Sequence, residues 1–219
     1  MKKKFLGIIP ARKGSKRLLN KNNRKIGKIS LTEKTIRSAL KCKMLNAIAI
    51  SSDDDKVLKT ASKFPNIKYI KRPKKLANST AKLTDVCKHV IKKITENFDY
   101  CVLLQVTSPL RTSKHIDQAI KKVLKNKALG LISVTTSKND EKNYYHIRNS
   151  HIYKCQVDKK IVSKKYQFNG SIFIMKTSYL KKKNLLFTNG KILPFIMSNN
   201  LSIDIDYLND LQKARMLDK

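Results

Sequence analysis

The segment FLGIIPARKGSKRLLNKN, residues 5–22, contains the pattern that decides the fold. Its apolar run, Phe5 to Ile9, ends at Pro10 and is followed by a loop with one glycine, one serine and five cations. An uninterrupted apolar run is typical of a strand buried on both faces, because a half-exposed strand would alternate with polar residues. The segment therefore predicts an interior strand whose carboxyl end opens into a basic loop.

The same unit, a short apolar run followed by an amphipathic stretch, recurs along the chain. Strands are predicted over residues 47–50, 67–70, 100–104, 129–134, 171–175, 192–197 and 201–205. Helices are predicted over residues 34–42, 84–97 and 207–217. Two more are predicted, one from the acidic run 53–55 to about residue 63 and one that begins after Thr112 or Ser113. This alternation is typical of an α/β fold, with a mostly parallel sheet and helices on both faces. Because ligands bind beyond the carboxyl ends of such strands, the loops at 10–22, 71–80 and 105–111 are expected to form one site.

The 219 residues are expected to form a single domain, since no internal repeat or Pro/Gly-rich linker divides residues 1–219. Residues 137–168 are polar and rich in Lys and Tyr, and they are expected to leave the core as a hairpin arm. No apolar run approaches the ~20 residues that span a bilayer, and the first one stops too early for a signal peptide. The four cysteines lack metal-type spacing and are expected to be thiols. These features predict a cytoplasmic protein without a membrane partner.

The net charge of +34 raises the question of a nucleic-acid partner. Of the 49 basic residues, 41 are Lys and 8 are Arg, and the Lys residues are spread along the whole chain. Specific readers of nucleic acids rely on the planar fork of Arg, which grips bases and phosphates in pairs of hydrogen bonds. We therefore expect no specific nucleic-acid partner. A non-catalytic, basic nucleic-acid-binding protein remains the alternative from another functional class.

The loop after the first strand has the chemistry of a polyphosphate site. Backbone amides beside Gly14 and Ser15, together with Lys and Arg side chains, are suited to phosphate oxygens. The loop lacks the Gly-x₄-Gly-Lys-Ser/Thr pattern of a P-loop. On charge alone, a solvated basic loop is the favoured interpretation.

The order of the residues changes that interpretation. Ile-Pro-Ala-Arg-x-Gly-Ser-Lys-x-Leu-x-x-Lys-Asn, residues 9–22, resembles the signature loop of the CMP-sialic acid (CMP-N-acylneuraminate) synthetase family, cytidylyltransferases that activate nonulosonic acids with CTP. The resemblance covers nearly the whole chain and implies a Rossmann-like sheet similar to nucleotide-diphospho-sugar transferases. It implies that Arg12 and Lys21 clamp the triphosphate and that Asn22 lies near the ribose. The CTP-binding residues that it implies are Ala11, Arg12, Gly14, Ser15, Lys21, Asn22, Arg72 and Ala81.

Two further loops carry the resemblance. Arg72-Pro-x-x-Leu-Ala77 resembles a family loop whose Arg helps to position the cytidine, although Ser79 stands where the family has Asp. Leu103 to Arg111 resembles Leu-Leu-Gln-Pro-Thr-Ser-Pro-Leu-Arg, with Val106 in place of the first Pro. The resemblance implies that Gln105 lies beside the sugar near its reacting hydroxyl. The alternative for Gln105 is a loop amide that caps the next helix.

The run Ser-Ile-Asp-Ile-Asp, residues 202–206, predicts a metal site. In a strand, residues i and i+2 share a face, so Asp204 and Asp206 would point together. Mg²⁺ takes one or two carboxylates plus phosphate oxygens, which predicts Mg²⁺ as the cofactor. The family has the same run, which supports that assignment. The alternative is that Asp206 caps the following helix and Asp204 pairs with a Lys.

The arm resembles the family least, and only Asn169-Gly-Ser-Ile-Phe-Ile matches clearly. In the family this region forms the dimer and reaches the sugar pocket, which implies a homodimer here. The sugar-binding residues expected on this basis, together with Gln105, are Lys142, Lys159, Tyr166, Phe168 and Asn169. With Lys so abundant, chance placement accounts equally well for Lys142 and Lys159.

Together these features predict an enzyme that joins CTP to a nonulosonic (sialic-type) acid, giving a CMP-sugar and pyrophosphate. The expected catalytic residues are Arg12, Lys21, Gln105, Asp204 and Asp206. A related alternative uses the eight-carbon 3-deoxy-manno-octulosonate, although Gly14-Ser15-Lys16 argues against it. An inactive member of the family is a third possibility, since the arm lacks family motifs. The sequence does not distinguish sialic, legionaminic and pseudaminic acids, because the selecting contacts fall in the arm.

Overall fold

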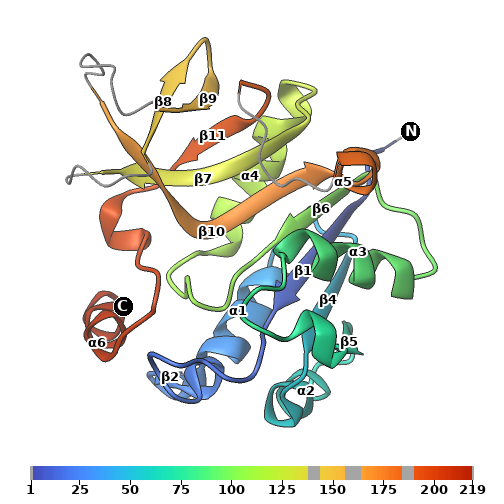
Figure 1. Cartoon of the computed structure of the whole chain (residues 1–219), viewed down its shortest axis with the longest axis vertical. Coiled ribbons are helices and arrows are strands. Elements are labelled where there is room, and N and C mark those ends of the chain that lie inside the picture. Colours follow the sequence, from blue (N-terminus) through green and yellow to red (C-terminus); the bar gives the residue numbers. More distant parts are fainter. Residues whose placement is uncertain (1, 138–143, 156–163, 184–189, 219) are drawn as a thin grey trace.

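A mixed sheet forms the centre of the molecule (Figure 1). The computed structural model describes residues 2–137, 144–155, 164–183 and 190–218. The strands of the main path lie in the order β11-β7-β10-β6-β1-β4-β5, and all run parallel except β10. Their bounds are β1 Phe5–Pro10, β4 Ala47–Ser52, β5 Ile67–Lys71, β6 Tyr100–Leu103, β7 Gly130–Thr136, β10 Tyr166–Lys176 and β11 Leu193–Ile196. The mostly parallel α/β fold predicted from the sequence is confirmed.

Strand β1 lies in the interior of the sheet, as its apolar run predicts. It pairs with β4 on one side and with β6 on the other. Its side chains alternate between the faces: Phe5 and Ile9 join one buried cluster, and Leu6 and Ile8 join the other. Each of these four side chains is at most 1% exposed, so both faces are covered. The parallel strands therefore end at one edge, where the loops that follow them meet.

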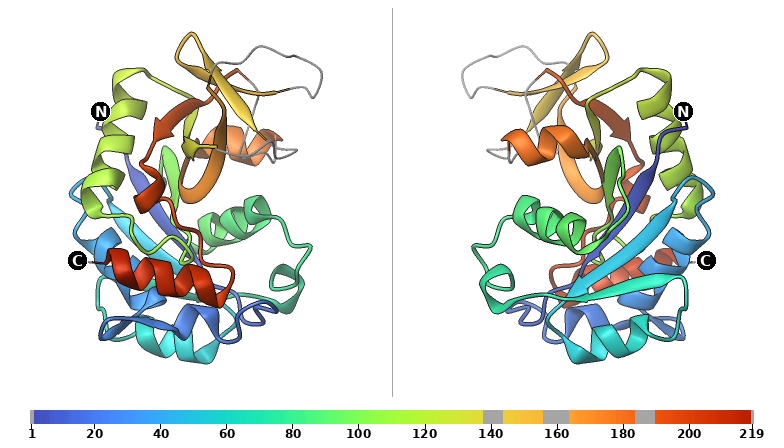
Figure 2. Two further views of the ribbon diagram at one scale, coloured as in Figure 1. Left: turned by 90° about the vertical axis from the view of Figure 1, so that its left-hand side faces the viewer. Right: turned by 90° about the vertical axis from the view of Figure 1, so that its right-hand side faces the viewer.

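Helices cover both faces of the sheet, and Figure 2 shows α3 and α4 on opposite sides of it. Buried residues of α1, α2, α4 and α6 pack in the cluster that contains Phe5, and those of α3 and α5 pack in the cluster that contains Leu6. The bounds are α1 Leu31–Leu40, α2 Asp55–Ala61, α3 Leu83–Lys93, α4 Ser113–Lys125, α5 Thr177–Lys183 and α6 Leu208–Leu217. A small hairpin of β2 (Lys25–Ile26) and β3 (Ile29–Ser30) precedes α1.

The described part of 137–168 contains a hairpin of β8 (Tyr145–Arg148) and β9 (His151–Lys154). The hairpin pairs with β10 and packs on this chain's own core through Tyr145 and Ile152. On its other side, Ile152 N donates to Ile192 O, and Ile152 O accepts a hydrogen bond from Gly190 N. Residues 138–143 and 156–163 lie outside the described residues, and the assignment of the segment to dimerisation stays a prediction.

Three predicted elements differ from the structure. Helix α1 begins at Leu31 rather than at residue 34, because the side chain of Ser30 caps it by accepting a hydrogen bond from Glu33 N. Helix α3 ends at Lys93, where Ile94 turns to an extended conformation. The strand predicted over 201–205 is wrong: Asn199–Leu201 is a short 3-10 turn, residues 202–205 belong to no strand of the described part of the chain, and Ile205 N donates to Thr107 O of a loop.

The four cysteines are free, as predicted. Three are buried in the two packed clusters, which leaves Cys155 as the partly exposed one. No helix among the described residues is long and apolar enough to cross a bilayer.

Candidate active site

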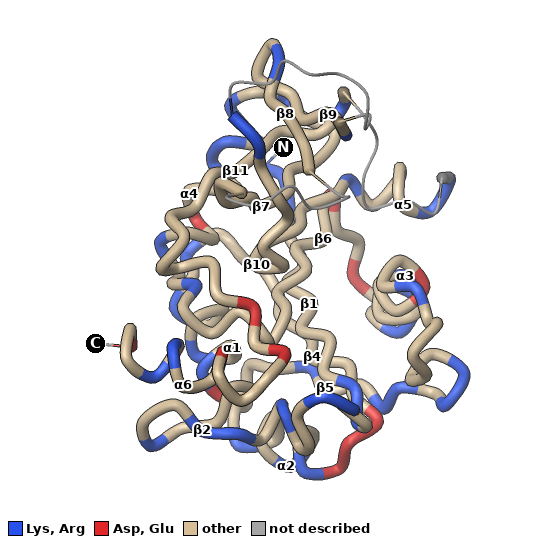
Figure 3. Tube along the Cα trace, turned by 60° about the vertical axis from the view of Figure 1, so that its left-hand side comes forward, with Lys and Arg blue, Asp and Glu red and all other residues tan. Residues whose placement is uncertain are grey.

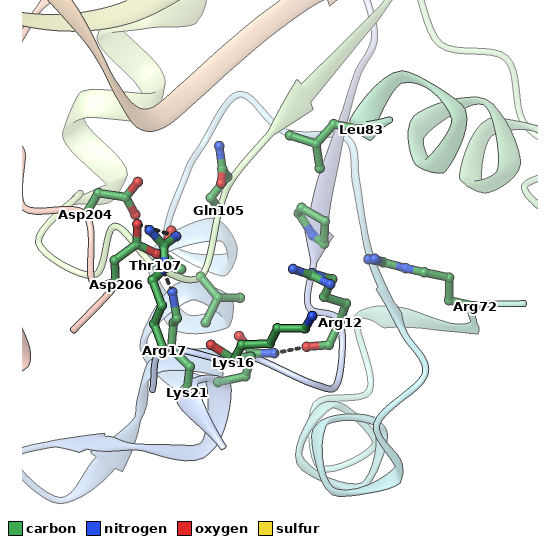
Figure 4. A pocket seen from close by; sticks show the side chains of 14 residues that line it. Arg12, Lys16, Arg17, Lys21, Arg72, Leu83, Gln105, Thr107, Asp204 and Asp206 are labelled. Atoms are coloured by element: carbon green, nitrogen blue, oxygen red, sulfur yellow. Dashed lines mark hydrogen bonds and ion pairs between the residues drawn. The ribbon is translucent and has the colours of Figure 1, made fainter. Parts of the chain in front are cut away.

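A cavity of about 610 Å³ opens at the carboxyl ends of the parallel strands (Figure 4). The loops predicted to converge do meet here: the first loop follows β1, Arg72 follows β5, and Gln105 follows β6. The segment before α6 completes the wall. The lining residues are Pro10, Arg12, Ser15, Lys16, Arg17, Lys21, Asn22, Arg72, Leu83, Gln105, Val106, Thr107, Asp204 and Asp206.

Hydrogen bonds from neighbouring elements fix the path of the first loop. Ala11 N donates to Ser51 O at 3.0 Å, and Lys13 N donates to Asp53 Oδ1 at 2.8 Å. The side-chain amide of Asn22 donates to Arg12 O at 2.8 Å, which closes the loop on itself. Gly14 has φ +81°, a left-handed conformation that disfavours other residues. The loop is therefore shaped before any ligand arrives.

Two guanidinium groups from different loops face the cavity. Arg72 is 4% exposed and donates from Nε to Ser51 Oγ at 3.1 Å and from Nη2 to Ser51 O at 2.7 Å. Burial lowers the pKa of Arg72 to about 10, the carboxylate of Asp53 opposes this change, and the like charge of Arg12 adds to it. Basic residues are also spread over most of the trace (Figure 3). What distinguishes Arg12 and Arg72 is that they crowd together at a cavity, which suits a polyanion.

The two aspartates of the acidic pair line the same cavity although their segment is not a strand. Asp206 accepts from Lys21 Nζ through Oδ1 and from Arg17 Nη2 through Oδ2, each at 2.7 Å. Asp204 is open to the cavity, yet the protein that surrounds its other sides partly desolvates it and raises its pKa above the usual range, and the Asp206 carboxylate adds to the rise. The buried Ile205 between them keeps both carboxylates on the cavity side.

The alternative role of Asp206 as a helix cap is wrong. The carboxylate of Asp210 caps α6, accepting from Asp206 N at 3.0 Å and from Tyr207 N at 2.8 Å. The two carboxylates on the cavity wall, Asp204 open to the cavity and Asp206 paired with Lys21 and Arg17, fit a divalent cation by the chemistry of their donors, because hard cations prefer carboxylate oxygen. Among the described residues no cluster of three or more His, Cys, Asp or Glu could hold a metal, so the other ligands would come from water or from a bound phosphate.

An irregularity in the pairing of β10 with β7, between Phe168 and Phe173, lies against the acidic pair. Gly170 has φ +69°, and a Cβ there would lie 3.3 Å from Asp204 Oδ2 and 3.5 Å from Gln105 Nε2. The neighbouring Asn169 is 3% exposed and uses its side chain within the protein, donating to Ser202 Oγ at 2.9 Å and accepting from Ser133 Oγ at 2.6 Å. Asn169 therefore holds the segment that carries the aspartates, and it does not line the cavity.

Tyr166 and Phe168, two of the predicted sugar-binding residues, do not line this cavity. Tyr166 is 7% exposed in the core, and Phe168 stacks on Tyr145 with ring centroids 4.0 Å apart. Lys142 and Lys159 lie outside the described residues. Of the predicted CTP-binding residues, Ala11, Gly14 and Ala81 do not line the cavity either, although Ala11 and Gly14 belong to the first loop.

Sequence reasoning missed Lys16, Arg17, Leu83 and Thr107, all of which line the cavity. The charge of Lys16 and Arg17 within the signature loop is a signal that could have found those two. The pairing of Arg17 with Asp206 has no local signal, because the two residues lie at opposite ends of the chain.

Comparisons with known proteins agree with this geometry. Residues 6–217 match the family model described as cytidylyltransferase. The chain is 31% identical to CMP-N,N'-diacetyllegionaminic acid synthase of Campylobacter jejuni, covering 97% of this chain and 94% of that protein. It is also 31% identical to N-acylneuraminate cytidylyltransferase of Escherichia coli, covering 98% of this chain and 52% of the longer relative.

A solved structure of CMP:2-keto-3-deoxy-manno-octonic acid synthetase complexed with CTP has the same fold. It is 17% identical, with a TM-score of 0.79 and 98% of each chain covered. The family model matches almost all of the chain, and the Campylobacter jejuni relative matches over nearly its full length, which identifies this nucleotidyltransferase as a member of the cytidylyltransferase family.

Proposed function

We propose that the protein transfers the cytidylyl group of CTP to a nonulosonic acid, giving a CMP-sugar and pyrophosphate. The single observation that carries the proposal is the cavity, where clustered cations face a pair of carboxylates beside Gln105. The named activities of relatives that match nearly the whole chain supply the substrate class.

The cations are placed to bind the triphosphate. Arg12 and Lys16 line the cavity, and no ion pair of the described residues engages either one. Arg72 is held rigidly by Ser51, so its charge is oriented before the nucleotide arrives. Groups that are already oriented stabilise the charge that develops on departing pyrophosphate without reorganising during the reaction. We assign to Arg12 and Lys21 the stabilisation of that leaving group.

Asp204 and Asp206 would hold a divalent cation, and we propose Mg²⁺. When bound, the ion supplies positive charge to the phosphate oxygens and helps to acidify the attacking hydroxyl. Lys21 and Arg17 hold Asp206, and Gly170 leaves room for Asp204. These contacts fix the carboxylates on one side of the cavity.

Gln105 would orient the sugar. Its side chain offers both a donor and an acceptor, and it lines the same cavity as the cations and the acidic pair. In the transfer, the anomeric hydroxyl of the sugar forms a bond to the α-phosphorus while the bond to pyrophosphate breaks. The hydroxyl loses its proton to solvent in this scheme, since none of the four histidines lines the cavity. We further propose a homodimer whose arm, including Lys142 and Lys159, completes the sugar pocket, and a cytoplasmic location where CTP is available.

The test is release of pyrophosphate from CTP by the purified protein with sialic, legionaminic and pseudaminic acids, with and without Mg²⁺. The expected result is Mg²⁺-dependent turnover with one of them, and 3-deoxy-manno-octulosonate serves as the eight-carbon comparison. Turnover with that acid alone would replace the proposed substrate class. Binding of CTP by folded protein without turnover of any acid would identify an inactive member of the family.

A further inference from the structure

Both oxygens of the Asp206 carboxylate are already engaged by protein cations. Lys21 Nζ lies 2.7 Å from Oδ1, and Arg17 Nη2 lies 2.7 Å from Oδ2. A divalent cation at this carboxylate would compete with at least one of these contacts, because like charges repel at such short range. The protein therefore contains a competitor for the cation that the proposed function assigns to Asp206.

The two protein cations differ in how firmly they are held. The side chain of Lys21 is 9% exposed, whereas that of Arg17 is 54% exposed. The Arg17 guanidinium also lies over the ring of Tyr207, 5.3 Å from its centroid, and that ring is itself exposed. Exposed ion pairs and exposed cation–π contacts are weak. Lys21 is thus the permanent partner of Asp206, and Arg17 is the exchangeable one.

The place to which Arg17 can move is the same cavity. Arg17 lies in the loop that carries Arg12 and Lys16, and all three line the cavity. A triphosphate offers several charged oxygens where Asp206 offers one carboxylate, and charge-assisted contacts of Arg to phosphate are strong. A nucleotide in the cavity therefore draws Arg17 away from Asp206.

We propose that Arg17 is a placeholder for the divalent cation. It neutralises Asp206 while the cavity is empty and transfers to the triphosphate when CTP binds, which frees Asp206 Oδ2. Metal and nucleotide then bind with positive coupling, and by linkage each raises the affinity for the other. This inference rests on the proposed function and adds an order of binding to it.

The test measures binding of Mn²⁺ alone to the full-length protein without nucleotide, from the loss of the free-ion paramagnetic resonance signal. Removing the competing charge in Arg17→Met is expected to tighten Mn²⁺ binding by up to about fivefold, the upper end of what an exposed ion pair contributes. The matched control is Lys16→Met, which removes the same charge from the same cavity but breaks no ion pair. The control is expected to gain clearly less. The difference between the two variants should shrink at high salt, because exposed charges are screened.

Three outcomes separate the placeholder from the proposed function. Equal Mn²⁺ affinity in Arg17→Met and Lys16→Met, or no gain in Arg17→Met, overturns the placeholder even if the protein turns over CTP. Loss of the gain in Mn²⁺ affinity in the double variant Arg17→Met/Asp206→Asn supports the placeholder. Mn²⁺ binding that is insensitive to Asp206→Asn in the wild-type background rejects the metal site itself. Unfolding temperatures of all variants are compared, and Arg17 is exposed enough that its substitution leaves the core intact.

Discussion

Gly170→Ala tests whether the irregularity in β10 positions the catalytic groups. At φ +69° an alanine is strained in any surroundings, at about 1–2 kcal/mol. Its Cβ would also lie 3.3 Å from Asp204 Oδ2 and 3.5 Å from both Gln105 Nε2 and Ser108 Oγ. Asp204 Oδ2 would have to shift by a few tenths of an ångström, whereas the two contacts at 3.5 Å are ordinary van der Waals contacts. A shift of ~1 Å at a reacting centre lowers rates ~100-fold, so we expect kcat to fall about tenfold.

Gly27→Ala is the matched control, because Gly27 has φ +58° and a Cβ there would meet nothing within 4 Å. Both variants are expected to lose about 1–2 kcal/mol of unfolding free energy, and each kcal/mol lowers the Tm by about 2–4 °C in a chain of this size. Only Gly170→Ala is expected to lower the kcat for pyrophosphate release from CTP. Full activity in Gly170→Ala at a lowered Tm would refute the reasoning, because the substitution would then strain the backbone without displacing the catalytic groups.

Three further substitutions follow from the same contacts. Asp204→Asn should abolish turnover but raise the Tm slightly near neutral pH, by less than ~4 °C. The pKa of Asp204 is raised in the folded protein, so its charge disfavours folding above that pKa, and the gain in Tm should vanish as the pH falls below the pKa of Asp204 in the unfolded protein. A lower Tm of the variant at pH 7 would contradict this expectation. Asn169→Ala removes one hydrogen-bond partner from each of the hydroxyls of Ser133 and Ser202 and leaves the buried Ser133 hydroxyl without its acceptor, so it should lower the unfolding free energy by about 2–4 kcal/mol. Unchanged stability with an altered KM for the sugar would instead favour direct contact with substrate. Arg72→Met should raise the KM for CTP about tenfold or more and leave the KM for the sugar unchanged, and an equal rise in both would show that Arg72 acts on the fold rather than on the nucleotide.

The fold could be predicted from the sequence because its strands are buried on both faces. Apolar runs such as Phe5 to Ile9 carry that signal locally, and parallel strands then place their loops at one edge. The strand prediction at 201–205 failed for a physical reason. Ile203 and Ile205 alternate with polar residues as in a strand, yet both pack on the core that contains Phe5, and the backbone hydrogen bond of Ile205 goes to Thr107 in a loop rather than to a strand.

The site was predicted where one segment brings its own chemistry, as Asp204 and Asp206 do. The role of a residue was missed where it depends on contacts between segments that are distant in the sequence. Asn169 matches a family motif, but only the structure places its side chain between Ser133 and Ser202 and away from the cavity. Tyr166 and Phe168 were predicted to line a sugar pocket, yet both pack in the core cluster that contains Tyr145 and Ile152 of the β8–β9 hairpin.

The balance of charge in the cavity explains why an acidic pair belongs in so basic a protein. Five cations line the cavity, and their charge would attract pyrophosphate as well as the triphosphate of CTP. Asp206 pairs with two of these cations, Arg17 and Lys21, so their charge would be shared between a carboxylate and any bound phosphate. In the placeholder proposal, Asp206 would regain Arg17 when pyrophosphate leaves, and the return of that ion pair would offset part of the lost contact between Arg17 and phosphate. Under the proposed function, the carboxylates would therefore aid release of the product as well as binding of the metal.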